Sequence, residues 1–135
     1  MTSTVIYEGN LRTKATHLQS GNSIITDAPT DNNGKGEAFS PTDLVASALG
    51  SCMMTIMGIY AHNHNISLDN TRLEVTKVMA SDPRRISTVH ITFYIPNSNL
   101  LDDVTRRKLE HAALHCPVAK SLHADIQQVV RFIYE

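Results

Sequence analysis

The chain has 135 residues, an ordinary share of hydrophobic and charged side chains, and a formal net charge of −1. This length and composition predict one domain, residues 1–135, with its own hydrophobic core. Without a broad basic surface, binding to nucleic acid or to an anionic membrane is not expected. The first ten residues hold no basic segment followed by an apolar run, so no secretory signal is predicted.

Residues 1–39 have the pattern of three short strands followed by a polar loop. Segments rich in β-forming residues lie at residues 4–8, 11–18 and 23–27, and turn signals containing glycine and asparagine separate them. They predict an antiparallel meander. Residues 28–39 are rich in glycine, asparagine and aspartate and are predicted to form a loop. Loops held by a rigid scaffold often carry functional residues.

A long hydrophobic helix is predicted at residues 40–63. Ser40 can cap it, Pro41 suits the first helical position, and Asp43 completes a capping box. No charged residue occurs from residue 44 to residue 61, and a helix that is apolar on every side must be buried. The run is about long enough to cross a bilayer, but strand-like segments on both sides need a core to cover. This favours a buried core helix over a membrane span.

The second half of the chain alternates strands and helices. Strands are predicted at residues 72–79, 86–95 and 126–134, and helices at residues 102–115 and 118–122. A short turn should join the first two strands as a hairpin. The order of elements predicts an α+β fold, with antiparallel sheets around a long buried central helix. Covering such an apolar helix on all sides further predicts an intertwined homodimer.

Two cysteines, Cys52 and Cys116, are the candidate reactive groups. Without a secretory signal we expect a cytoplasmic protein, where free or redox-active thiols are more common than structural disulfides. From the residues alone, either cysteine could be the attacking nucleophile. Cys52 would need a nearby cation, for which Arg12 and Lys14 are the candidates. Cys116 could sit at the start of a helix opened by Pro117 and meet unpaired backbone amides there.

Other functions fit parts of the same pattern. Free cysteines are often buried without a function, which leaves a binding module or a structural dimer open. A metal site is a further alternative, although no standard zinc-ligand spacing is present. A histidine could also serve as a base for Cys52 in acyl transfer. The histidines near helix ends and near Cys116 are His62, His64, His115 and His123.

Three segments together resemble the OsmC/Ohr family of hydroperoxide-reducing proteins. They are residues 40–52, which end in Cys52; residues 115–118, with the sequence HCPV around Cys116; and residues 7–12, which end in Arg12. The resemblance implies an interlocked homodimer with active sites at the subunit interface, and thiol-dependent reduction of organic hydroperoxides. It further implies that Cys52 is the peroxidatic thiolate, Cys116 the resolving thiol and Arg12 the cation that stabilises the thiolate.

One position departs from the family pattern. Active members place a glutamate directly after the motif proline, where it holds the arginine, and this chain has Thr42 there. Asp43 follows, but on a helix it points about 100° away from that position. Glu37 in the preceding loop is therefore the candidate partner of Arg12. The departure places the chain nearer to a less characterised OsmC-like branch.

The mechanism implied by the resemblance keeps all redox change on sulfur. Cys52 becomes a sulfenic acid, Cys116 condenses with it to a disulfide, and an external dithiol restores both thiols. Neither a cofactor nor a metal is expected, and the role is defence against oxidative stress. A pocket for an organic substrate could be lined by Met53, Met54, Ile56 and Met57, for which plain core packing is the favoured interpretation. The alternative function is a catalytically weak dimer that binds a small molecule or serves a structural role.

Overall fold

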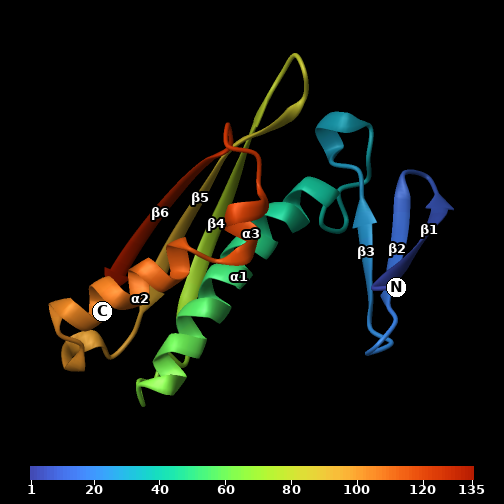
Figure 1. Cartoon of the computed structure of the whole chain (residues 1–135). Coiled ribbons are helices and arrows are strands. Elements are labelled where there is room, and N and C mark those ends of the chain that lie inside the picture. The colour runs from blue at the N-terminus through green and yellow to red at the C-terminus, as the bar shows by residue number, and fades with distance from the viewer. The chain divides into compact units, whose positions relative to one another are not determined.

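The structure, a computed structural model, describes all residues from 1 to 135 and divides into two compact units, residues 1–45 and 46–135 (Figure 1). The mixed α+β class predicted from the sequence is confirmed. The first unit contains β1 (Ser3–Gly9), β2 (Arg12–His17), β3 (Ser23–Asp27) and the short 3-10 helix η1 (Thr30–Asn32). The prediction of a single domain remains a prediction, and each unit is described by itself.

The central helix α1 (Pro41–Asn63) starts in the first unit and continues into the second. The second unit also contains β4 (Arg72–Ala80), β5 (Arg85–Ile95), the 3-10 helix η2 (Ser98–Leu100), α2 (Asp103–Leu114), α3 (Pro117–Ser121) and β6 (Gln127–Tyr134).

The first sheet is the antiparallel meander β1-β2-β3 that the turn signals predict. Its register places Arg12, the first residue of β2, directly opposite Asp27, the last residue of β3. Directly opposite residues of an antiparallel pair share one face and lie close together. The register therefore puts a cation and a carboxylate side by side at one end of the sheet.

The predicted capping box at the start of α1 is confirmed. The backbone N–H of Asp43 donates to Ser40 Oγ at 3.1 Å, and the backbone N–H of Ser40 donates to the Asp43 carboxylate at 3.0 Å. Pro41 is the first helical residue, where its missing N–H has no consequence. These reciprocal bonds fix where α1 begins.

Within one chain, α1 buries a single face rather than its whole circumference. The buried residues are Ala46, Leu49, Gly50, Met53, Met57 and Ala61. At Gly50 the helix comes so close to the second sheet that an added Cβ would lie 3.1 Å from Cγ2 of Val75. Residues at helical spacing on another face stay exposed: Ala48, Ser51, Thr55 and Ile59. Within the second unit, only one side of the helix is therefore covered.

The second sheet has the order β4-β5-β6, and α1 and α2 lie on the same face of it (Figure 1). The predicted hairpin of β4 and β5 is confirmed. The prediction of purely antiparallel sheets is wrong for one pair, because β6 runs parallel to β5. The connection between them passes through α2 and α3, and a long crossover of this kind is what parallel neighbours require.

The core of the second unit lies between that sheet and the two helices. The predicted alternation in β5 is confirmed, since Val89, Ile91, Phe93 and Ile95 are all buried. The ring of Phe93 stacks on Phe132 of β6 with 4.8 Å between the ring centroids. Leu109 and Ala113 of α2 are buried in the same core.

The helix α1 is long and apolar enough to cross a membrane, with a mean hydropathy of 1.7 over its most apolar stretch. Core helices of soluble proteins share these properties. The packing of α1 on the second sheet accounts for the apolar character of its buried face.

Candidate active site

Cys52 and Cys116 are both free thiols in the second unit. Cys52 lies in the middle of α1 and is half-buried at the edge of the core, and Cys116 is fully buried. The two thiols are close enough to interact, since the Cys52 thiol contributes to raising the pKa of Cys116. The fold therefore brings together two residues that are 64 positions apart in the sequence.

Cys116 occupies the helix start that its sequence context suggests. It is the N-cap residue of α3, with Pro117 at the first helical position. The backbone N–H of Ala119 donates to Cys116 Sγ at 3.4 Å, so the sulfur takes the place of the usual capping oxygen. The break between α2 and α3 thus fixes the direction of the Cys116 side chain.

Burial decides the charge state of Cys116. Burial raises the pKa of the thiol, the Ala119 N–H opposes this in part, and the neighbouring Cys52 thiol raises the pKa further. Near neutral pH Cys116 is therefore held as the neutral thiol. A neutral buried thiol is a poor first nucleophile, because the thiolate is the reactive form.

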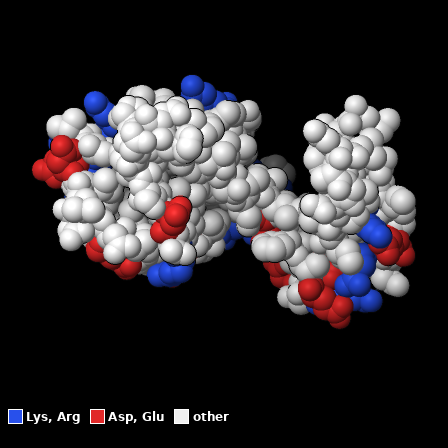
Figure 2. Space-filling model, turned by 90° about the horizontal axis from the view of Figure 1, so that it is seen from below, with Lys and Arg blue, Asp and Glu red and all other residues white.

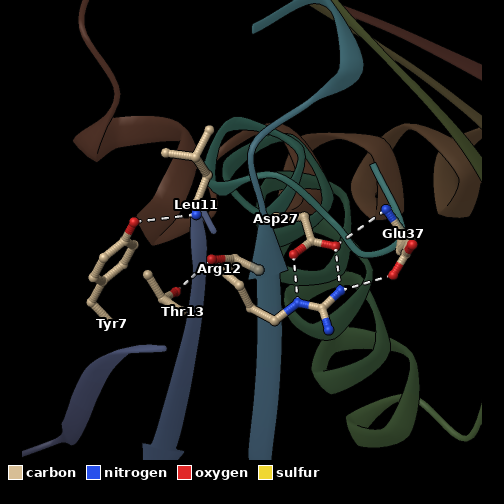
Figure 3. Close-up of polar contacts among 7 residues, drawn as sticks. Tyr7, Leu11, Arg12, Thr13, Asp27 and Glu37 are labelled. Carbon is tan, nitrogen blue, oxygen red and sulfur yellow. Dashed lines mark hydrogen bonds and ion pairs between the residues drawn. The ribbon is translucent and has the colours of Figure 1, made fainter. Parts of the chain in front are cut away.

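The first unit holds a second cluster, built around Arg12 (Figure 3). Arg12 Nε donates to Asp27 Oδ1 at 2.7 Å, and Arg12 Nη2 donates to Asp27 Oδ2 at 2.8 Å. Nη2 also donates to Glu37 Oε2 at 3.1 Å, and the backbone N–H of Glu37 donates to Asp27 Oδ2 at 3.2 Å. One cation thus lies between two carboxylates, and the loop carboxylate is also tied to the cluster through its backbone.

The charges of this cluster stabilise one another. The hydrogen bonds from Arg12 hold the pKa of Asp27 below its usual value, although burial acts in the opposite direction. The hydrogen bonds that Arg12 donates to Asp27 and Glu37 raise the pKa of Arg12. Arg12 is therefore a permanent cation, and Asp27 stays ionised at neutral pH.

The predicted site residues fall into two groups. Cys52 and Cys116 meet in one unit, and Arg12 and Glu37 meet in the other.

Sequence reasoning missed Asp27. The predicted meander could have indicated it, because the β2-β3 hairpin in this register pairs Arg12, the first residue of β2, with Asp27, the last residue of β3. Thr42, at the position of the family glutamate, exchanges a hydrogen bond with the Ser40 hydroxyl at 3.2 Å.

The histidines are not gathered into a group of metal ligands within this chain. No group of three His, Cys, Asp or Glu side chains is arranged to hold a metal ion. His64 Nδ1 lies 2.8 Å from the Tyr60 carbonyl oxygen, and His115 Nδ1 lies 2.7 Å from the His111 carbonyl oxygen. These local contacts with the backbone, one turn back, account for both rings.

Comparisons with known proteins agree on one family. The model of the family described as OsmC-like protein matches residues 34–130. A crystal structure from Psychrobacter arcticus 273-4, provisionally named an osmotic stress induced and detoxification response protein, is 58% identical, with a TM-score of 0.93. The match covers 98% of this chain and 95% of that one. No curated protein matches the sequence.

Two more distant structures share the fold. The organic hydroperoxide resistance protein OsmC of Legionella pneumophila is 16% identical with a TM-score of 0.76, covering 98% of this chain and 97% of its own. A provisionally named organic hydroperoxide resistance protein of Vibrio cholerae is also 16% identical, with a TM-score of 0.74 and coverages of 98% and 91%. The latter was crystallised with captopril in one of its active sites.

Proposed function

Because this chain belongs to the OsmC-like protein family, we propose that it is a thiol-dependent peroxidase that reduces organic hydroperoxides, and secondarily hydrogen peroxide. The observation that carries the proposal is the pair of free thiols, one half-buried and one buried, that lie at one core, close enough for the Cys52 thiol to raise the pKa of Cys116. Two relatives of the same fold are named for organic hydroperoxide resistance, which supports this substrate class.

The proposed reaction starts at Cys52. Its thiolate attacks one peroxide oxygen, the O–O bond breaks, and an alcohol leaves after taking up a proton, so that Cys52 becomes a sulfenic acid. The Cys116 sulfur then displaces water from the sulfenic acid, and the S–S bond forms. An external dithiol reduces this disulfide by exchange and is itself oxidised to a disulfide. The raised pKa of Cys116 supports its role as the second, resolving thiol.

In this proposal Arg12 is the cation that stabilises the Cys52 thiolate, and Glu37 is one of its carboxylate partners. The roles follow the family pattern, in which an arginine held by a carboxylate serves the first cysteine. A cation lowers the pKa of a nearby thiol and so increases the reactive fraction. The active sites of this protein then lie at the interface of a homodimer, in the cytoplasm, where they serve defence against oxidative stress. Two unpaired cysteines suit a reducing compartment.

A peroxide titration tests the proposal. Adding cumene hydroperoxide to the reduced protein without a reductant should remove two thiols for each peroxide consumed. Mass spectrometry of the digested protein should then show the peptides of Cys52 and Cys116 joined by a disulfide. Cys52→Ser should leave the peroxide unconsumed. If the wild-type protein keeps both thiols after peroxide is added, the peroxidase proposal is wrong. The alternative, a dimer that binds a small molecule or serves a structural role, would then be favoured.

We further propose that the working form is a homodimer, because the first sheet lacks a core of its own. Its apolar side chains remain exposed: Val5, Ile6, Tyr7, Ile24 and Ile25. A small sheet needs a packed layer to be stable in water. Light scattering after gel filtration should give about twice the 14.9 kDa mass of the chain.

Val5→Asp should shift the protein towards monomer, since it places a charge among these apolar side chains. The control Leu100→Asp, at a residue of the second unit that is 88% exposed, should leave the mass unchanged. A wild-type mass of one chain at micromolar concentration would overturn the homodimer.

A further inference from the structure

The partner that holds Arg12 most firmly is Asp27, a residue that the family pattern does not point to. The two side chains are opposite each other in the β2-β3 ladder, so backbone pairing already places them together. Arg12 then gives Asp27 two parallel hydrogen bonds, at 2.7 and 2.8 Å. This bidentate geometry fixes the plane of the guanidinium as well as its position.

Asp27 and Glu37 contribute unequally to this contact. The Asp27 side chain is 1% exposed, whereas the Glu37 side chain is 65% exposed and accepts one bond from Arg12 at 3.1 Å. The backbone around Asp27 is also fixed, because its N–H donates to the Phe39 carbonyl oxygen at 3.1 Å. A buried bidentate pair on paired strands restrains the arginine far more than one bond to an exposed loop side chain.

The two carboxylates use Nε and Nη2 and leave the third guanidinium nitrogen without a partner. Figure 3 shows Nη1 of Arg12 directed away from both Asp27 and Glu37. Both N–H groups of Nη1 are thus available to an oxygen or sulfur anion. Their direction is set by the Asp27 contact, since the guanidinium is planar and rigid.

We infer that Asp27 is the positioning residue of this enzyme: it fixes the plane of the Arg12 guanidinium and leaves Nη1 as the group that can bind an anionic sulfur or peroxide oxygen. It takes the place of the family glutamate that Thr42 replaces in this chain. Glu37 then adds charge without setting the geometry. The inference rests on the proposed peroxidase function and names a residue that acts only through Arg12.

Steady-state kinetics of peroxide reduction, with a dithiol as reductant, test whether Asp27 matters more than Glu37. Asp27→Asn keeps the shape but can accept only one of the two bonds, and it should lower kcat/KM about 100-fold, the cost of a misplaced catalytic group. Glu37→Gln should lower kcat/KM no more than about fivefold, as for an exposed ion pair. Glu8→Gln, which removes an exposed carboxylate from the same sheet, should have no effect.

A double substitution separates positioning from a general structural role. If Asp27 acts only through Arg12, then adding Asp27→Asn to Arg12→Ala should cost no further activity. At neutral pH, the rate at which iodoacetamide alkylates Cys52 should also fall in Asp27→Asn, to the value expected for Arg12→Ala. A further loss in the double variant, or a Glu37→Gln loss as large as that of Asp27→Asn, would overturn the inference.

If Asp27→Asn does not fold, Arg12→Lys tests the positioning role of Asp27 instead. Lysine keeps the charge but cannot make two parallel bonds to one carboxylate, so kcat/KM should fall by a similar factor. Wild-type kcat/KM in Arg12→Lys would overturn the inference.

Failure of the peroxidase proposal can be distinguished from failure of the Asp27 inference. In that case the wild type consumes no peroxide, and the rate at which phenylglyoxal modifies Arg12 becomes the readout. That rate should still rise more in Asp27→Asn than in Glu37→Gln if Asp27 holds the arginine. Equal rates in the two variants would contradict the role of Asp27 whatever the enzyme does.

Discussion

Cys52→Ser is expected to lower the rate of peroxide reduction by a factor on the order of 10⁴ or more, the scale seen when an enzyme loses its nucleophile. A serine hydroxyl cannot be oxidised to the equivalent of a sulfenic acid, so the first step has no substitute within the chain. The measurement is the loss of cumene hydroperoxide with dithiothreitol in excess. Ser51→Ala, at the exposed neighbour of Cys52 on α1, is the matched control and should keep wild-type turnover.

Cys116→Ser should give a different kinetic pattern. The first peroxide is still reduced, because Cys52 remains, but the sulfenic acid then lacks its resolving thiol. Stopped-flow mixing should therefore show one rapid turnover per subunit, followed by turnover at the slower rate at which the external thiol reaches Cys52. The opposite pattern, with Cys52→Ser retaining the first turnover and Cys116→Ser losing it, would reverse the assigned roles.

Phe93→Ala should destabilise the protein by about 3–5 kcal/mol, the usual cost of removing a buried phenyl ring. Phe93 is fully buried on the central strand β5 and stacks on Phe132 of β6. The substitution removes the contact with Phe132 and leaves a cavity in the core. Urea unfolding followed by circular dichroism measures the change as a lower midpoint.

Leu100→Ala is the control for Phe93→Ala. Leu100 is 88% exposed, so its truncation should change the free energy of unfolding by no more than about 0.5 kcal/mol. All variants should be compared at one protein concentration, because the stability of a dimer depends on concentration. A Phe93→Ala effect as small as that of Leu100→Ala would mean that the core is not packed around this ring.

Local signals in the sequence predicted most of the elements. The capping box at Ser40 marked the start of α1, because both of its hydrogen bonds join residues three positions apart. The alternation of apolar and polar residues likewise identified the buried face of β5, because the two-residue period of a strand can be read from a short segment. The proline that follows Cys116 likewise predicted the start of a helix, because proline is favoured at the first helical position.

What the sequence left undetermined depends on pairing between distant segments. The apolar pattern of residues 126–134 is the same for either strand direction, so it could not reveal that β6 runs parallel to β5. Asp27 was missed because its contact with Arg12 arises from the register of two strands, which no single segment contains. Which face of α1 is buried within a single chain was also not evident from the sequence, because an apolar composition does not state which chain provides the cover.

The close approach at Gly50 has a consequence for how a disulfide could form. Two residues before Cys52, the helix backbone lies so close to Val75 that an added methyl group would be 3.1 Å from its Cγ2, so this part of α1 is tightly packed against the second sheet. Cys116 instead caps the five-residue helix α3, whose first residue is Pro117. Such a short, proline-bounded segment opens at far lower free-energy cost than a helix packed in the core. If the proposed disulfide forms, we therefore expect the motion that closes the S–S bond to come from α3, with α1 as the fixed side.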